Sequence, residues 1–198
     1  METVSFTKMS DGTAEDYEFL AKHEAEYAKD LPNRIMTALE GLRNSLAGYK
    51  IDRLEHSLQS ATRAERDGAD VDWIVSALIH DMGDDLAPFN HDSLAANILR
   101  PYVREECAWV VQHHGIFQYK YYADKVGLDP DARDKFKDHP YFDAAVKFCE
   151  KWDQTSFDPD YDTHNLEHFQ PMVEAVFTRK AWDPDVIQSN DLASTARV

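Results

Sequence analysis

Cysteine, basic side chains and long apolar runs are scarce in this sequence of 198 residues. Its two cysteines, Cys107 and Cys149, form neither a CxxC nor a CxxH motif, which argues against a disulfide framework and a structural zinc knuckle. No apolar run approaches the roughly 20 residues of a membrane span, and the first residues lack the basic and then apolar pattern of a signal peptide. We therefore expect a cytoplasmic protein with one domain and one sizeable core.

Basic side chains are outnumbered by acidic ones. The chain has 21 Lys and Arg against 37 Asp and Glu, which gives a formal net charge of −16 at pH 7. Such a surface repels phosphate backbones and anionic lipid headgroups, so we expect neither nucleic acid nor a membrane as a partner. A local pocket can still bind an anion. The charge excludes partners better than it identifies a substrate, and it leaves the oligomeric state open.

The spacing of apolar residues predicts an all-α fold. These residues recur mostly at helical intervals, and alternating strand patterns are scarce. Capping residues, prolines and glycines mark the expected ends of the helices. The expected helices span about residues 13–29, 33–46, 51–67, 70–83, 91–100, 101–115, 141–153 and 165–179.

The apolar face of the helix expected at 70–83 ends in polar groups. His80 follows Trp73 by seven residues, and Asp81 follows Ile74 by seven, so both project from the buried face. An ionised carboxylate left unpaired there would cost several kcal/mol. Asp81 is therefore expected to be paired or to bind a metal.

Polar groups also continue the apolar faces of other helices. Asp153 does so in the helix at 141–153, and we prefer His114 to His113 as the inward histidine of the helix before it. His91 begins a short helix, while periodicity alone does not select His56. A lone buried histidine is more often part of a hydrogen-bonded core, but four histidines and two aspartates on separate helices together indicate a metal site. Nitrogen and oxygen ligands suit iron, manganese, cobalt or zinc.

These six candidate ligands, in their order along the chain, resemble those of the HD superfamily of all-α metalloproteins. They are His56, His80, Asp81, His91, His114 and Asp153. The resemblance covers about residues 50–155 and implies a single HD-domain helical bundle with extra N-terminal helices. We expect an N-terminal helical extension packed on the core at 1–48, an HD-type metal-binding domain at 49–180 and a C-terminal tail at 181–198.

Most members of this superfamily are phosphohydrolases, but one branch contains O₂-using di-iron enzymes. Myo-inositol oxygenase belongs to it, as does the dioxygenase that cleaves hydroxylated aminoethylphosphonate. The segments LEHSLQSA around His56 and KWDQ around Asp153 are similar to that branch. The resemblance implies one iron ion held by His56, His80, Asp81 and Asp153, and a second held by His91, His114 and the bridging Asp81. It also implies an Fe(II)/Fe(III) pair, with Asp81, His91 and His114 as catalytic residues. The implied reaction uses O₂ to cleave a C–C or C–P bond in a small hydroxylated substrate.

The chain departs from both oxygenases at positions where they carry substrate-binding groups. It has Gln118 and Glu150 where the phosphonate enzyme has a lysine and an arginine, and Asp84 where the inositol enzyme has a lysine. Tyr49 replaces the glutamate of a Tyr-x-x-Glu lid pattern. We expect Asp84, Gln118, Tyr49, Tyr121 and Glu150 to bind a less anionic substrate or one with an ammonium group. Alternatively, Asp84 supports a metal ligand or is simply solvated.

Other functions are open at this point. A binuclear HD phosphohydrolase acting on a phosphoester or nucleotide needs the same six ligands, with manganese, cobalt or zinc as alternatives to iron. A non-catalytic sensor or scaffold is disfavoured because a retained ligand set is costly. A serine nucleophile is disfavoured because no G-x-S-x-G motif occurs. Residues 1–45 could form a lid carrying Tyr17, His23 or Tyr27, or simply cover the core, which we prefer.

Overall fold

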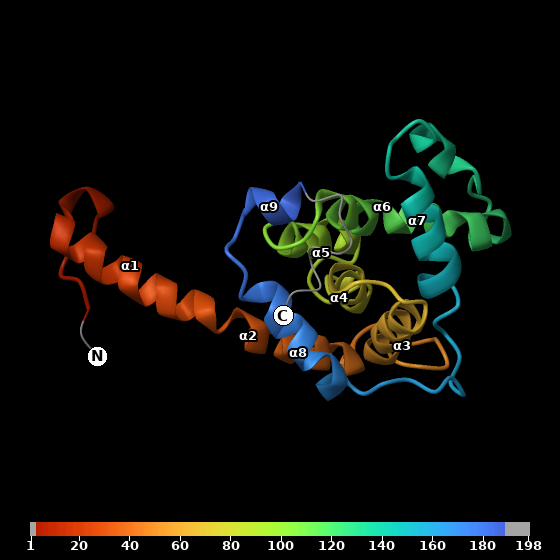
Figure 1. Ribbon diagram of the computed structural model, residues 1–198, viewed down its shortest axis with the longest axis horizontal. Helices are drawn as coiled ribbons and strands as arrows, with labels where there is room; N and C mark the ends of the chain where they lie inside the picture. The colour runs from red at the N-terminus through yellow and green to blue at the C-terminus, as the bar shows by residue number, and fades with distance from the viewer. Residues whose placement is uncertain (1–2, 189–198) are drawn as a thin grey trace.

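The described part of the chain, residues 3–188 of a computed structural model, is helical and contains no strand, which confirms the all-α prediction (Figure 1). The helices are α1 (Ala14–Lys29), α2 (Leu31–Gly41), α3 (Arg53–Arg66), α4 (Val71–Ile79), α5 (His91–Leu99), α6 (Glu105–Tyr122), α7 (Phe142–Phe148), α8 (Leu166–Phe177) and α9 (Pro184–Ile187). The 3₁₀ turns are η1 (Met9–Asp11), η2 (Leu42–Asn44), η3 (Ala123–Val126) and η4 (Ala132–Phe136), and η5 (Cys149–Asp153) is a π-helical turn. None of the helices in this range combines the length and the apolar composition that a membrane span requires.

Helix α4 lies at the centre of the bundle, with α3, α6 and α8 packed against it (Figure 1). Every residue from Asp72 to Ile79 is buried, and Val75 and Leu78 are completely inaccessible. A helix surrounded in this way has no solvated face, so the residues that follow it emerge inside the protein. This explains how His80 and Asp81 are buried at its C-terminal end.

The N-terminal end of α4 is held by buried ion pairs. Asp70 caps the helix and accepts a hydrogen bond from Arg104 Nη2 at 2.8 Å. Asp72, which is fully buried, accepts hydrogen bonds from the backbone N of Arg104 at 3.1 Å and from Arg179 Nη1 at 2.7 Å. These contacts tie α4 to the segments before α6 and after α8, and they fix the helix in position.

The bounds of two helices near the site differ from the prediction. Helix α4 ends at Ile79 instead of continuing to residue 83, because the chain turns there to reach α5. Helix α6 begins at Glu105 instead of Pro101 and runs past Gly115 to Tyr122. A glycine inside a packed helix costs about 1 kcal/mol relative to alanine, which tertiary packing readily offsets.

The N-terminal helices do not behave alike. Helix α2 packs against α8 and buries Ile35 and Leu39, as expected of a segment that covers the core. Helix α1 has no buried residue between Ala14 and Lys29 and stands away from the body in Figure 1, so the expected packing of the extension does not hold for it. Its capping box, formed by Thr13 and Asp16, defines its start locally. The expected C-terminal tail contains α9, and its residues 189–198 lie outside the described residues.

Candidate metal centre

Six side chains converge beyond the C-terminal end of α4. Their positions are His56 on α3, His80 and Asp81 after α4, His91 at the start of α5, His114 on α6 and Asp153 at the end of η5. Five of the six residues are at most 3% exposed. The exception is His91, whose side chain is 25% exposed, so the cluster is closed on one side and accessible on the other.

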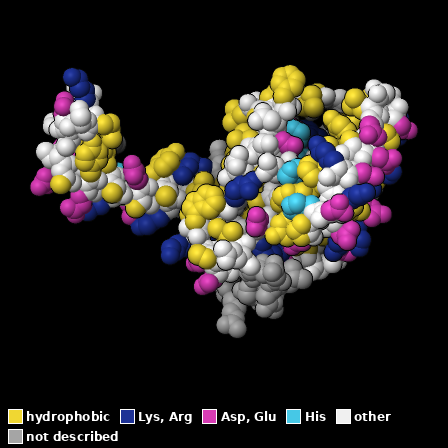
Figure 2. Space-filling model, turned by 90° about the horizontal axis from the view of Figure 1, so that it is seen from above, with side chains coloured by type: hydrophobic (Ala, Val, Ile, Leu, Met, Phe, Trp, Pro, Cys, Tyr) yellow, Lys and Arg dark blue, Asp and Glu magenta, His cyan; other side chains and the backbone are white. Residues whose placement is uncertain are grey.

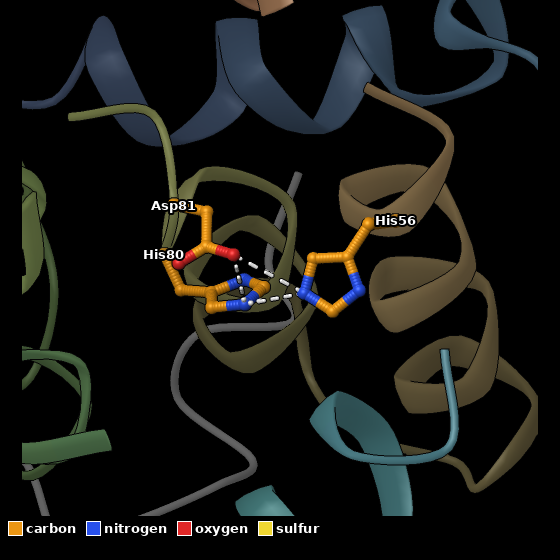
Figure 3. A group of neighbouring side chains, drawn as sticks. All are labelled: His56, His80 and Asp81. Atoms are coloured by element: carbon orange, nitrogen blue, oxygen red, sulfur yellow. Dashed lines mark hydrogen bonds and ion pairs between the residues drawn. The ribbon is translucent and has the colours of Figure 1, made fainter. Parts of the chain in front are cut away.

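The two oxygens of Asp81 serve two different groups of nitrogens. Asp81 Oδ2 lies 3.2 Å from His56 Nε2 and 3.4 Å from His80 Nε2, and Figure 3 shows these three side chains converging. Asp81 Oδ1 lies 3.2 Å from His91 Nε2 and also 3.2 Å from His114 Nε2. A carboxylate in this arrangement can bridge two cations.

Asp153 completes the first of these groups. Its Oδ1 lies 3.4 Å from His56 Nε2 and 3.6 Å from His80 Nε2. Its Oδ2 is buried and has no hydrogen-bond partner among the described residues. A buried carboxylate oxygen without a donor is costly unless a cation satisfies it.

The imidazole rings are oriented by hydrogen bonds from their other nitrogen. His56 Nδ1 donates to the carbonyl oxygen of Ser156 at 2.8 Å. His80 and His114 donate from Nδ1 to carbonyl oxygens three residues earlier, at 2.8 Å and 2.7 Å. In this tautomer each Nε2 carries a lone pair. His56 Nε2 and His80 Nε2 are 3.1 Å apart, and two lone pairs at that distance repel each other unless a cation lies between them.

Protons are the alternative to a metal as the source of positive charge. Burial lowers the pKa of His56, but hydrogen bonds to Asp153 and Asp81 raise it to about 9. Burial likewise lowers the pKa of His114, but the hydrogen bond and the charge of Asp81 raise it to about 9. Burial raises the pKa of Asp81, but positive charge on His80 and the imidazole hydrogen bonds hold it well below its usual range. The cluster therefore requires positive charge, and a bound metal would replace protons on its ligands.

The donor set fits two metal ions of the kind that accept nitrogen and oxygen. Donor atoms lie within 4.8 Å of one another in three sets, namely His56, His80 and Asp81, then Asp81, His91 and His114, and finally His80, His114 and Asp153. Asp81 is shared between the first two sets. The first group offers four protein donors and the second offers three, which leaves open positions at the second. Cys149 belongs to none of these donor sets. Its Sγ donates toward the carbonyl oxygen of His114 at 3.5 Å, and burial raises the pKa of its thiol. Iron, manganese, cobalt and zinc are compatible with this set.

Asp84 and Arg53 support the centre from outside it. Asp84 Oδ1 lies 3.4 Å from His91 Nδ1, and Asp84 Oδ2 accepts a hydrogen bond from Arg53 Nε at 2.5 Å. Arg53 also donates from Nη2 to Asp81 Oδ2 at 2.5 Å. The sequence carries a local signal for Arg53. It precedes His56 by three residues on the same helix, so both side chains lie on one face.

Gly83 allows His91 to reach the centre. A Cβ atom at this position would lie 2.6 Å from the carbonyl oxygen of His91 and 2.8 Å from its Cα. These are backbone atoms, so relieving the clash would require the chain at His91 to move. The absence of a side chain at Gly83 therefore lets the turn after α4 approach the first residue of α5.

A cavity of about 890 Å³ opens at the centre, and its lining includes residues of both donor groups. Figure 2 shows histidine side chains at the floor of a hollow in the body. Four of the residues predicted to bind substrate line the cavity, namely Tyr49, Asp84, Gln118 and Tyr121. Glu150 does not belong to the described lining and is exposed, because η5 turns Cys149, Trp152 and Asp153 inward and leaves Glu150 on the outside.

Helix α1 contributes nothing to the described lining of this cavity. Its residues Tyr17, His23 and Tyr27 are therefore not lid residues in this conformation. The aromatic cover comes instead from Phe157, whose ring stacks on His56 at a centroid distance of 4.3 Å, and from Tyr49, which stacks on Phe157 at 5.0 Å. Sequence periodicity gave no signal for Phe157, because it lies in a loop.

The π-helical turn η5 was also not predicted. Gln154 N donates to Cys149 O at 3.0 Å, five residues earlier, which defines the turn. Such turns occur frequently at functional sites. Here the turn ends at Asp153 and presents it to the histidines.

Comparison with known proteins places an HD domain at residues 53–147, where the chain matches the family model of that name. This supports the HD resemblance, and proteins with this domain are generally metalloenzymes. Five of the six candidate ligands lie within the match, while Asp153 lies beyond its end. The chain matched no curated protein sequence.

Proposed function

We propose that this protein is an O₂-dependent non-haem di-iron oxygenase that cleaves a C–C bond in a small hydroxylated substrate. The family match supports the coarser function, that of a metal-dependent enzyme of the HD type. The observation that supports the oxygenase best is the charge of the cavity. Among the described residues, Arg53 is the only Lys or Arg side chain in the lining, and it already pairs with Asp81 and Asp84.

This charge distribution disfavours a substrate that carries a phosphate or phosphonate group. Recognition of such a dianion commonly uses free Arg or Lys donors. The cavity instead presents the carboxylates of Asp84 and Asp85 together with tyrosine rings. A neutral polyol-like substrate fits this lining, as does one with an ammonium group that contacts Asp85 and an aromatic face. The same consideration favours a C–C bond over a C–P bond as the one cleaved.

The six ligands would hold the two iron ions as two groups that share Asp81. The first group would be His56, His80, Asp81 and Asp153, and the second Asp81, His91 and His114. When bound, the iron pair would supply the redox chemistry with O₂ and the Lewis acidity that activates a substrate hydroxyl. Five of the six ligands, all but His80, lie in the cavity lining, so a substrate in the cavity could reach both groups.

The surrounding side chains would orient the substrate and exclude water. Gln118 and Tyr121 extend from α6 and offer an amide and a hydroxyl to substrate hydroxyl groups. Tyr49, which precedes α3, and Phe157, which follows η5, cover the cavity as a stacked pair. Tyr49 is 53% exposed, so it lies at the mouth, where it could shield bound substrate from solvent.

The alternative is a binuclear phosphohydrolase, and the HD match itself supports it. The decisive experiment loads the purified protein with iron and measures two activities in parallel. We expect O₂ uptake with a panel of hydroxylated compounds that includes polyols and hydroxylated ammonium compounds, and an EPR signal of a mixed-valent pair. Release of phosphate from a generic phosphoester without O₂, and no O₂ uptake, would replace the oxygenase by the hydrolase.

A further inference from the structure

A second group of side chains able to bind a metal lies on the surface, where His164 before α8 and His168 in the first turn of α8 meet Glu65 on α3. His168 Nε2 lies 2.8 Å from Glu65 Oε2 and 3.1 Å from Oε1, and His164 Nε2 lies 3.5 Å from the same Oε2. The two imidazole rings are stacked, with centroids 4.1 Å apart and an interplanar angle of 21°. His164 and His168 therefore each direct their Nε2 atom toward the carboxylate of Glu65.

A simple ion pair does not require this arrangement. One imidazolium is sufficient to neutralise Glu65, and a second positive ring stacked on the first would be repelled by it. If one ring is neutral, its nitrogen lone pair becomes available beside a carboxylate oxygen. A single divalent cation would use both imidazole nitrogens and the carboxylate at once.

We propose that Glu65, His164 and His168 bind one divalent transition metal ion, with Zn²⁺ as the best match. Zinc commonly takes histidine nitrogen at roughly 2.0–2.1 Å and carboxylate oxygen at roughly 2.0–2.2 Å, which separates neighbouring ligands by about 3.3 Å in a tetrahedron. One donor atom from each of the three residues lies within 4.8 Å of the others. The three protein ligands leave a fourth position for water.

The site is accessible to an ion from solvent. The side chains of Glu65, His164 and His168 are 27%, 37% and 36% exposed. Neighbouring cationic groups are engaged elsewhere. Arg66 Nη2 pairs with Asp162 Oδ2 at 2.9 Å, and Arg63 donates to the carbonyl oxygen of Thr155. The formal net charge of −16 also favours the approach of a cation.

A metal at this position would fasten the segment between η5 and α8 to helix α3. His164 already donates its backbone N–H to Thr62 Oγ1 on α3. The same segment carries Ser156, whose carbonyl oxygen accepts the hydrogen bond of His56, and Phe157, which stacks on His56. The surface metal would therefore stabilise the segment that orients one ligand of the buried centre, and it would take no part in the reaction.

Metal counting with Zn²⁺ as the only added metal tests this site. The wild-type protein, the His168→Ala variant and the His23→Ala variant would be equilibrated with excess Zn²⁺, desalted and analysed for zinc per chain. His23 is an exposed histidine on α1 and serves as the control. We expect wild type and His23→Ala to retain one zinc ion more than His168→Ala. Zinc should also raise the melting temperature of His23→Ala more than that of His168→Ala.

The difference between variants does not depend on the proposed oxygenase activity or on how many ions the buried centre holds. A Glu65→Gln variant should behave like His168→Ala, since it removes the anionic ligand from the other side of the site. Equal zinc content in wild type, His168→Ala and Glu65→Gln would overturn the proposal. Loss of the same ion in His23→Ala would overturn it too.

Discussion

The two ends of helix α4 both bury carboxylates, but they neutralise them differently. At the N-terminal end, Asp72 is surrounded by the guanidinium of Arg179 and by the backbone and side chain of Arg104. At the C-terminal end, Asp81 meets one arginine, Arg53, and four imidazole nitrogens at 3.2–3.4 Å. Arginine brings a permanent charge, whereas an imidazole protonated at Nδ1 offers a lone pair.

This difference distinguishes a carboxylate whose charge is balanced by arginines from one that is placed to bind a metal. The arginine pairs of Asp72 balance its charge without any further component. The histidines around Asp81 balance its charge only after they take up protons or after a cation binds between them. Burial alone, which is nearly equal for the two aspartates, does not make this distinction.

Removal of the bridging carboxylate should have the largest effect. In the Asp81→Ala variant both donor groups lose their shared ligand, so we expect metal content to fall from two ions in the buried centre toward none and activity to disappear. Metal analysis and O₂ uptake measure this. Asp85→Asn, which alters an exposed carboxylate of the cavity lining, should keep its metal. Full metal content and activity in Asp81→Ala would show that the ligand assignment is wrong.

The corresponding change at the other end of α4 should affect stability and not metal binding. Asp72→Ala removes the buried carboxylate partner of Arg179 and leaves Arg104 paired with Asp70 alone. Breaking a buried ion pair costs about 3–5 kcal/mol in free energy of unfolding. Denaturant unfolding measures this, with Asp67→Ala as the control. Asp67 forms surface pairs with Lys147 and Lys151, whose loss costs about 1 kcal/mol or less. If Asp72→Ala lost metal while remaining fully folded, the contrast between the two ends would not hold.

The sequence predicted much of the C-terminal end of α4 because the information is local. Helical spacing from Trp73 and Ile74 places His80 and Asp81 on the buried face, and the structure buries both. The preference for His114 over His113 followed from the same periodicity, and His114 is 3% exposed. A buried helix face is encoded in the residues of that helix alone.

Features that depend on contacts between distant segments could not be predicted in this way. Arg53 pairs with Asp84 across 31 positions, and Gly83 is required because α5 approaches it in space. The π-helical turn η5 and the stacking of Phe157 on His56 also arise from tertiary packing. Helix α1 was expected to help cover the core, but its own residues do not form a buried face.

A smaller effect is expected when the ion pair between Arg53 and Asp84 is removed. Asp84→Asn keeps an oxygen near His91 but removes one of the two carboxylates that pair with Arg53, so Arg53 Nε becomes available to an anion while Nη2 stays paired with Asp81. Since a charge-assisted hydrogen bond is worth roughly 1.5–3 kcal/mol, inorganic phosphate should bind about 10-fold more tightly. Competition against substrate or direct calorimetry measures this. Asp85→Asn changes the net charge equally without freeing Arg53, and equal phosphate binding by both variants would contradict the role of the pair.

The smallest expected effect is a dependence of stability on pH that differs between metal-free and metal-loaded protein. In the metal-free protein the pKa values of His56 and His114 are raised to about 9, above the roughly 6.5 of an unfolded chain. Their stabilising contribution is complete below about pH 6.5 and is lost as pH rises through about 9. The metal-loaded protein has no such protons to lose, so its melting temperature should fall less over this range. In thermal unfolding between pH 6.5 and 9, the difference in melting temperature between the two forms should increase with pH. A difference that decreases with pH would mean that protons do not replace metal at the buried centre.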